Sequence, residues 1–293
     1  MTYTLFLGDR TYSSWSLRGW LLFENFGLKA AATYLDFSAP GAIAKQIPQH
    51  APARTVPTVI TPEGAIVSES LAIAEELASR HPGAGIWPED PLARATARTL
   101  AAEMTSGFTA LRNFCPMHLR IAYRDIDVPD DVKTDLARLE LVWAHARKTT
   151  GSTGPWLCGE YSAADAFFAP VAARIAGYGL AVNDDAQAYV AAHLADPAFR
   201  RWRAMGIAAG DYLERYRRDH KTTEWPGPAP MSAQAIDTGT AENALCPYSG
   251  AEITHLAQIE GRIFGFCNAF CRDKTIADAA AFPAFMKVFQ NPL

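Results

Sequence analysis

The sequence predicts an α/β unit, then an all-α domain, and finally a small α+β module rich in cysteine. Three observations carry this prediction. Strand and helix patterns alternate over residues 1–80, helical spacing dominates residues 89–216, and three of the five cysteines lie in residues 244–293. The segment before that module, residues 217–243, holds prolines and small polar residues with little apolar periodicity, which is typical of a linker or arm.

Four strands and two helices are expected in the α/β unit, with a short helix or loop between the second and third strands. The strands are predicted at residues 3–7, 31–36, 56–60 and 65–67. A helix follows the polar turn after the first strand, because Leu17, Trp20 and Leu21 share one helical face and Gly27 marks the end of the pattern. A second helix is expected from Glu69 to Arg80.

Residues 89–216 are expected to form a bundle of helices. Apolar side chains recur at helical spacing over residues 100–111 and again over residues 132–147. Ser162 and Asp165 stand three positions apart just before an apolar run, which is the spacing of a capping box at a helix start.

The composition excludes some classes of function. The formal net charge is -4 and the basic residues are dispersed, which argues against nucleic acid or an anionic membrane as the main partner. The first ten residues lack the pattern of a signal peptide, and no apolar stretch is long enough to span a bilayer. A cytoplasmic location is therefore expected. The five cysteines, an odd number, do not indicate a framework of disulfides.

Two predicted helix starts carry serine, and each has two interpretations. Ser13 and Ser14 can cap the first helix, or a hydroxyl there can donate a hydrogen bond to a bound thiolate in the favourable field of the helix start. Glu69 and Ser70 can likewise cap the next helix, or its exposed amides can bind the carboxylate of a ligand.

The Val56-Pro57-Thr58 tripeptide interrupts the third predicted strand. A proline cannot donate to a strand ladder, so the chain either places an ordinary trans proline at a sheet edge or turns through a cis bond. The cis form would leave the Val56 backbone free to pair with an extended peptide ligand. On the tripeptide alone, the trans form is favoured.

Taken in order, these features resemble the glutathione transferase family over residues 3–215. The resemblance implies a thioredoxin-like, glutathione-binding domain over residues 1–80 and an all-α domain over residues 89–216. It further implies an enzyme that activates the glutathione thiol for attack on a small electrophile, with isomerase or reductase variants, and that forms a homodimer.

Within that family, the serine turn followed by Arg18 is similar to the zeta-type pattern. The resemblance implies that Ser13 activates the thiol, with Ser14 as the alternate. The zeta-type pattern carries a cysteine directly after the two serines, where this chain has Trp15. That departure argues against the isomerase activity of zeta enzymes.

The resemblance also implies contacts for each part of glutathione. Val56, with Pro57, would hold the cysteinyl backbone, and Glu69 and Ser70 would bind the γ-glutamyl end. Lys45 would meet the glycyl carboxylate.

The region around residue 108 is similar to a bacterial subgroup of the family. Met104, Phe108 and Arg112 fall on one helical stripe and are candidates for lining the electrophile site. The alternative is that Met104 and Phe108 belong to the core.

The C-terminal cysteines form a C-x20-C-x3-C array that resembles small metal-binding modules of the YHS and TRASH type. Cys267 and Cys271 lie one turn apart at a predicted helix start, after a predicted hairpin around Gly261, and with Cys246 they suit tetrahedral zinc. His255 is the nearest candidate for a fourth ligand. The alternatives for the fourth ligand are a solvent molecule, Asp273 or a histidine of the main body. Free thiols in a small aromatic core would need no metal.

The appended module leaves a second interpretation of the whole chain. Since no metal takes part in glutathione chemistry by analogy with the family, the zinc is expected to be structural or to serve docking or sensing. The alternative to an enzyme is therefore a non-catalytic scaffold that binds partners or senses metal through its cysteines. Cys115 and Cys158 lie in apolar surroundings and are expected to be buried.

Overall fold

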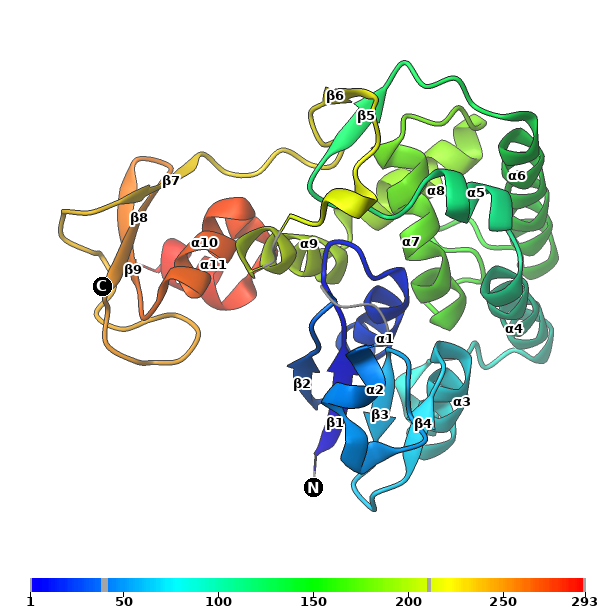
Figure 1. Ribbon diagram of the computed structural model, residues 1–293, viewed down its shortest axis with the longest axis horizontal. Coiled ribbons are helices and arrows are strands. Elements are labelled where there is room, and N and C mark those ends of the chain that lie inside the picture. Colours follow the sequence, from blue (N-terminus) through cyan, green and yellow to red (C-terminus); the bar gives the residue numbers. More distant parts are fainter. Residues whose placement is uncertain (1, 38–41, 210–211, 292–293) are drawn as a thin grey trace. The chain divides into compact units, whose positions relative to one another are not determined.

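The computed structural model describes residues 2–37, 42–209 and 212–291 (Figure 1). The chain folds into two compact units. The first comprises Met1–Leu194 and Leu213–Pro226, and the second comprises Ala195–Tyr212 and Gly227–Leu293. None of the helices in the described ranges is both long and apolar enough to cross a bilayer.

The first unit begins with a four-stranded sheet of order β2-β1-β3-β4. Its elements are β1 (Tyr3–Leu7), α1 (Ser14–Glu24), β2 (Ala30–Tyr34), α2 (Ala42–Gln46), β3 (Thr58–Ile60), β4 (Ile66–Ser68) and α3 (Ser70–Arg80). β1 and β2 pair in parallel, and β1–β3 and β3–β4 pair antiparallel. This is the predicted α/β order, with boundaries shifted by one or two residues.

Both faces of this sheet are covered. Along β1, Leu5 and Leu7 point to one face of the sheet and Phe6 points to the other, and all three are buried. Phe6 packs with Ile47 and Ala53 from the segment after α2. α1 and α3 pack against each other, and α1 approaches Pro57 so closely that a Cβ on Gly19 would lie 2.6 Å from the proline ring.

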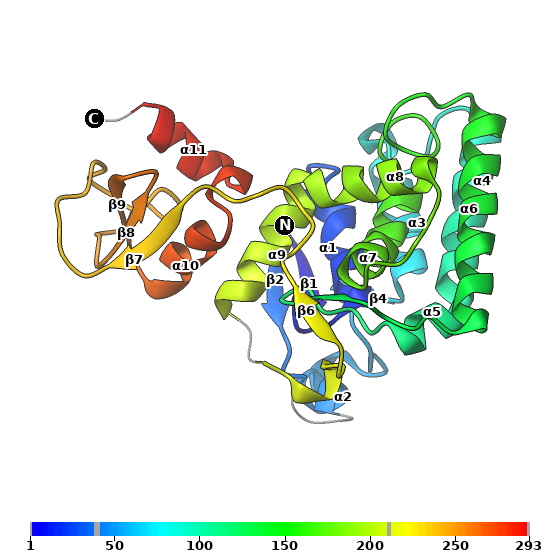
Figure 2. The ribbon, with the colours of Figure 1, turned by 90° about the horizontal axis from the view of Figure 1, so that it is seen from above.

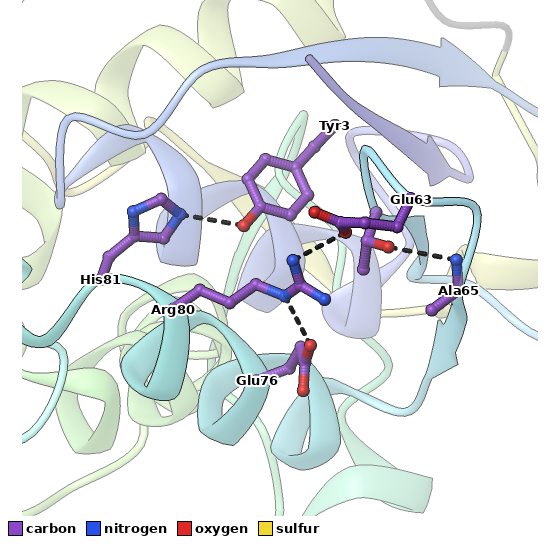
Figure 3. A network of polar contacts seen from close by, with 7 residues as sticks. Tyr3, Glu63, Ala65, Glu76, Arg80 and His81 are labelled. Carbon is purple, nitrogen blue, oxygen red and sulfur yellow. Dashed lines mark hydrogen bonds and ion pairs between the residues drawn. The ribbon is translucent and has the colours of Figure 1, made fainter. Parts of the chain in front are cut away.

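A polar network fixes the C-terminal end of α3 to the sheet (Figure 3). Arg80 donates from Nη1 to Glu63 in the β3–β4 turn, at 2.7 Å, and from Nε to Glu76 on its own helix, at 2.5 Å. The next residue, His81, bonds through Nε2 to the Tyr3 hydroxyl of β1, at 2.9 Å. The ion pairs are largely exposed, so their role is orientation more than stability.

The helical part of the first unit surrounds one long buried helix. Its elements are α4 (Pro91–Ser106), α5 (Thr109–Phe114), α6 (Asp130–Thr150), α7 (Ala163–Gly177) and α8 (Asp184–Ala195), with a short ladder between β5 (Ala122–Arg124) and β6 (Lys221–Thr223). α7 is buried over nearly its whole length and packs against α1 and α4 (Figure 2). The predicted capping box at its start is confirmed, with Ser162 and Asp165 bonding reciprocally.

The helix expected through residues 100–111 breaks at Gly107. A Cβ there would lie 2.8 Å from the carbonyl oxygen of Glu103, which explains the glycine. Phe108 then takes a left-handed conformation, with φ of 55°, before α5 begins. The expected single stripe of Met104, Phe108 and Arg112 is therefore wrong, because the three residues lie on two different elements.

The second unit is a three-stranded antiparallel sheet of order β7-β8-β9 with helices against it (Figure 1). Its elements are α9 (Pro197–Ala209), β7 (Ala233–Ile236), β8 (His255–Ile259), β9 (Arg262–Phe266), α10 (Ala269–Ala277) and α11 (Pro283–Gln290). Glu260 and Gly261 form the predicted turn of the β8–β9 hairpin, both with positive φ. Phe264, Phe266 and Phe285 form a fully buried aromatic core.

Two elements of this unit lie outside the segment expected for the cysteine-rich module, residues 244–293. β7 lies within the expected linker and supplies an edge strand. α9 lies within the expected all-α domain but packs on α10, where Arg200 forms a bidentate pair with Asp278 at 2.7 and 2.8 Å. The added strand and helix bury the core that fifty residues alone could not bury.

We expect acid to destabilise the first unit through a buried histidine on α8. Burial lowers the pKa of His193 to about 3, so the folded protein holds it neutral while the unfolded chain takes up a proton below pH 6.5. The unfolding free energy should therefore fall as the pH drops from 6.5 to 3, on the order of 4 kcal/mol for this group. Denaturant unfolding at several pH values measures this.

His193→Phe should remove the contribution of His193 to the acid-induced loss, whereas His118, whose pKa burial lowers to about 4, should keep its own contribution. The variant keeps the ring contacts with Tyr189 and Trp156. His145→Phe, at an exposed site on α6, serves as the control and should leave the pH dependence unchanged. An unaltered slope in the His193 variant would contradict the assignment.

Candidate functional site

Ser13 acts as the N-cap of α1. Its Oγ accepts a hydrogen bond from the Ser16 amide at 3.2 Å and donates to the Ser16 hydroxyl at 2.8 Å, and the residue is 4% exposed. The Ser16 hydroxyl in turn accepts from the Gly8 amide at 2.7 Å. The Ser13 hydroxyl proton is therefore already used in the hydrogen bond to Ser16, which agrees with the capping interpretation of the sequence.

Ser14, the first residue of α1, is the more available hydroxyl. It is partly exposed, and its Oγ accepts a hydrogen bond from Nη2 of Arg174 on α7, at 3.4 Å. Within the described residues its own proton has no recorded acceptor. A hydroxyl polarised by a guanidinium at a helix start can donate to a thiolate and stabilise its charge.

Arg174 belongs to a cluster of three neighbouring guanidinium groups, two of which contact Trp15, and we call it the arginine cluster. It comprises Arg18 on α1, Arg112 on α5 and Arg174 on α7. The guanidinium carbons of Arg18 and Arg112 lie 4.5 and 5.2 Å from the Trp15 ring centroid. Arg174 is also fixed by the carbonyls of Cys115 and Pro170, at 2.8 and 3.2 Å.

Among the described residues, no ion pair compensates the positive charge of the arginine cluster. No carboxylate of the described residues forms an ion pair with any of the three, and Nε and Nη1 of Arg18 are buried without a hydrogen-bond partner. Burial and then the two neighbouring arginines hold the pKa of Arg18 well below its usual range. Burial, then Arg112, lowers the pKa of Arg174 to about 10, so Arg174 stays charged at neutral pH. Such a site favours the binding of an anion.

Glu69 and Ser70 lie together at the start of α3 in an unusual backbone geometry. Glu69 has φ of 71° and ψ of 128°, a conformation that favours glycine. Its carboxylate is exposed and accepts from Thr55 at 3.4 Å, whereas Ser70 is buried with no partner for its Oγ in the described part of the chain. A carboxylate, an unpartnered hydroxyl and the amides of a helix start suit an amino-acid ligand.

A pocket of about 310 Å³ opens beside Glu69, lined also by Arg54, Thr55 and Ser68. The Val56–Pro57 bond close by is cis, so the trans form favoured by the tripeptide alone is wrong. Pro57 packs against Gly19 of α1, and this contact between distant residues cannot be inferred from the tripeptide alone. β3 begins only at Thr58, which leaves the Val56 backbone beside the sheet rather than inside its ladder.

Of the four remaining predicted contacts, Lys45, Met104 and Phe108 do not line the site, whereas Arg112 does lie beside Trp15. Lys45 is exposed at the end of α2. Met104 is fully buried and Phe108 is 5% exposed, so the structure supports the core interpretation over a lining role. Arg112 is partly exposed and lies beside Trp15, where its Nη1 also donates to the carbonyls of Thr105 and Gly107.

The second unit brings the three C-terminal cysteines together. The sulfur atoms of Cys246, Cys267 and Cys271 all lie within 4.8 Å of one another. Cys246 and Cys271 are buried, and Cys267 is partly exposed. Three convergent thiols at this spacing are suited to a soft metal ion.

Hydrogen-bond donors surround these sulfur atoms. Cys267 Sγ accepts from Ser249 Oγ and from Asn268 Nδ2, each at 3.3 Å. Burial alone would raise the pKa of Cys246, but the amides of Tyr248, Cys267 and Ser249 outweigh it and lower that pKa to about 6. These donors favour a thiolate at Cys246, whereas burial raises the pKa of the Cys271 thiol to about 12. The thiolate is the form that binds metal.

His255 is not part of this cluster. The group of close metal-binding side chains in the described residues contains the three cysteines alone, and His255 bonds through Nδ1 to Thr254 at 2.9 Å. Cys115 and Cys158 are buried as expected, and burial raises the pKa of each thiol to about 12.

The sequence did not indicate two members of the first site. Arg174 reaches Ser14 across 160 positions of sequence, and nothing in its local pattern distinguishes it from a surface arginine. Trp15 was noted only as a departure from the zeta-type pattern, whereas in the structure its ring contacts two arginines.

Comparison with known proteins finds similarity to a known family in part of the first unit. Residues 12–80 match the family model for the glutathione S-transferase N-terminal domain. A probable maleylacetoacetate isomerase from Caenorhabditis elegans is 33% identical over 110 residues, which cover 38% of this chain and half the length of that relative.

Solved structures show the transferase fold beyond that segment. A glutathione transferase homologue from Burkholderia with bound glutathione gives a TM-score of 0.53 at 22% identity, covering 70% of this chain and 98% of that one. Ure2p in complex with S-hexylglutathione gives a TM-score of 0.53 at 19% identity, covering 69% of this chain and 98% of that one. Glutathione transferase Omega 1C from Trametes versicolor gives a TM-score of 0.52 at 20% identity, covering 69% of this chain and 90% of that one. The thioredoxin-like sheet followed by helices is therefore a glutathione transferase fold.

We expect alanine substitutions of the two serines of the turn to have different effects on the unfolding free energy. Ser13→Ala removes the cap of α1 and should lower the unfolding free energy by about 1 kcal/mol. Ser14→Ala removes no cap and should cost less, because the one hydrogen bond that it removes, from Arg174, is long at 3.4 Å. Denaturant unfolding of both variants measures this, and equal losses would contradict the assigned roles.

Proposed function

We propose that the first unit is a glutathione transferase that activates the thiol at Ser14 and acts on a small electrophile bearing an acidic group. One observation carries the proposal. The Ser14 hydroxyl accepts from Arg174 inside a cluster of three arginines that lacks any compensating carboxylate within the described residues.

The thiol step follows from the charges around Ser14. Glutathione thiol loses its proton more easily where the thiolate receives a hydrogen bond and faces positive charge. Ser14 supplies the hydrogen bond, and the start of α1 and Arg174 supply the field. Ser13 holds the turn in place, and so acts on the chemistry through the position of Ser14.

Glutathione would bind where β3 and α3 begin. The Val56 backbone, next to Pro57, would pair with the cysteinyl backbone, and Glu69 and Ser70 would hold the γ-glutamyl end. The unpartnered Ser70 hydroxyl supports this placement, because a buried polar atom without a partner is costly unless a ligand satisfies it.

The class of electrophile follows from the arginine cluster. A carboxylate at Arg112 would satisfy the excess positive charge, and Trp15 offers a flat apolar face beside it. The Caenorhabditis relative is named for isomerising maleylacetoacetate, which is itself a carboxylate. Addition to an acidic, electron-poor double bond or ring is the reaction that these residues favour.

A pair of aryl chlorides tests the proposal. With 4-chloro-3-nitrobenzoate the glutathione thiolate displaces chloride from a ring that bears a carboxylate, and the methyl ester offers the same ring without the charge. The parent protein should prefer the acid in kcat/KM. Arg112→Met should reduce that preference about tenfold or more, because a hydrogen bond to a charged group contributes about 1.5–3 kcal/mol.

Two further variants complete this test. Arg138→Met removes an exposed arginine that pairs with Glu103 and should leave the preference unchanged. Ser14→Ala should lower kcat/KM for both substrates equally, since the thiolate is common to both reactions. Absence of activity together with absence of glutathione affinity in the parent protein would refute the transferase assignment.

A second function is favoured by the cysteines of the second unit. We propose that Cys246, Cys267 and Cys271 bind zinc as thiolates, with the fourth position filled by a ligand other than His255. The metal would add folding free energy to a small core. If the first unit lacks turnover, this site supports the alternative of a scaffold that senses metal or binds a partner.

Metal analysis of protein purified without chelators should find one zinc per chain. Cys271→Ser should lose the metal and lower the melting temperature, because binding energy at such sites is folding energy. Cys115→Ala changes a buried thiol in the first unit and should retain the metal. Parent protein that is free of metal, with its thiols reduced, would refute the zinc site.

A further inference from the structure

The Asn268 side chain uses both ends of its amide beside the cysteine site. Its Oδ1 accepts from the Cys271 amide at 2.8 Å, which makes Asn268 the N-cap of α10. Its Nδ2 donates to Cys267 Sγ at 3.3 Å. One side chain therefore contacts the backbone of one proposed metal ligand and the sulfur of another.

Helix capping explains only half of this arrangement. A cap requires an acceptor, and serine, threonine and aspartate supply one as well as asparagine does. None of those three could also give an N–H to the sulfur while its oxygen holds the Cys271 amide. The N–H···S contact is therefore a property of asparagine that the helix start itself does not need.

Cys267 is the cysteine for which such a contact matters most. It is the only partly exposed member of the three, and it precedes α10, so the helix itself does not hold it. Ser249 gives its sulfur a second donor at 3.3 Å, and Thr254 holds its carbonyl at 2.7 Å. The surroundings of Cys267 thus fix both the backbone and the sulfur.

We propose that Asn268 is a positioning residue of the metal site, which turns Cys267 toward Cys246 and Cys271 and offsets part of the charge on its sulfur. This inference rests on the proposed zinc site. Three thiolates around a divalent ion carry one net negative charge, and N–H donors reduce the cost of holding that charge in a partly buried place. Outer contacts of this kind are worth about 10- to 100-fold in metal affinity.

Asn268→Asp is the sharpest test, since it changes one atom group and keeps the cap. Its carboxylate can still accept from the Cys271 amide, so the metal-free protein should melt at the same temperature or higher. The N–H donor is replaced by a negative oxygen facing the sulfur. Zinc affinity, measured by competition with a chelating indicator, should fall about 10- to 100-fold.

Asn268→Ser provides a neutral version of the same change. The shorter side chain keeps a cap acceptor but gives up the amide N–H, so zinc affinity should fall in the same direction by a smaller factor. In protein loaded with cobalt(II), the sulfur-to-metal charge-transfer band should move to lower energy in both variants, because a sulfur without its donor holds its electrons less tightly.

Asn183→Asp is the matched control. Asn183 accepts from the Ala186 amide at the start of α8 in the first unit, so the same exchange is made at a helix start without a cysteine. Its zinc affinity and cobalt spectrum should equal those of the parent protein.

The outcomes separate two failures. If the parent protein binds no zinc, the metal site itself is refuted. If the parent binds zinc and Asn268→Asp binds it equally or more tightly, or the cobalt band stays in place, Asn268 is a helix cap only and the inference is overturned.

Discussion

The buried carboxylate of Asp165 is the interaction on which the first unit depends. It accepts from the Ser162 amide and hydroxyl, the Leu157 amide and the Tyr189 hydroxyl, at 2.8 to 3.2 Å. These four bonds offset the cost of burying an acid and set where α7 begins. Since α7 runs through the core beside α1, its start determines where Arg174, three turns later, meets the serine turn.

The proposed chemistry of the first unit thus draws on three helices that belong to two layers. α1 supplies Ser14, Trp15 and Arg18 from the sheet layer, whereas α5 and α7 supply Arg112 and Arg174 from the helical layer. A site made in this way depends on packing rather than on a loop. Its positive charge remains uncompensated within the described residues, a cost that binding of an acidic group would remove.

Much of this fold could be predicted from the sequence because its signals are local. The strand and helix order of residues 1–80, the capping box at Ser162, and the β8–β9 turn depend on neighbours within a few positions. The contact of Arg174 with Ser14, the cis bond at Pro57 and the packing of α9 on α10 depend on residues far apart in sequence. The break at Gly107 could be predicted only in part. The glycine is a local signal for a helix end, but the apolar periodicity on both sides of it favoured one continuous helix.

The boundary of the second unit has a consequence for how this chain can be divided or inherited. The backbone passes between the units at residues 194–195, 212–213 and 226–227, so the second unit is discontinuous in sequence. Removal of residues 227–293 would leave α9 without the helix it packs on. The cysteine-rich part is therefore not a detachable appendix. Gene fusion, truncation or transplantation must carry α9 along with it.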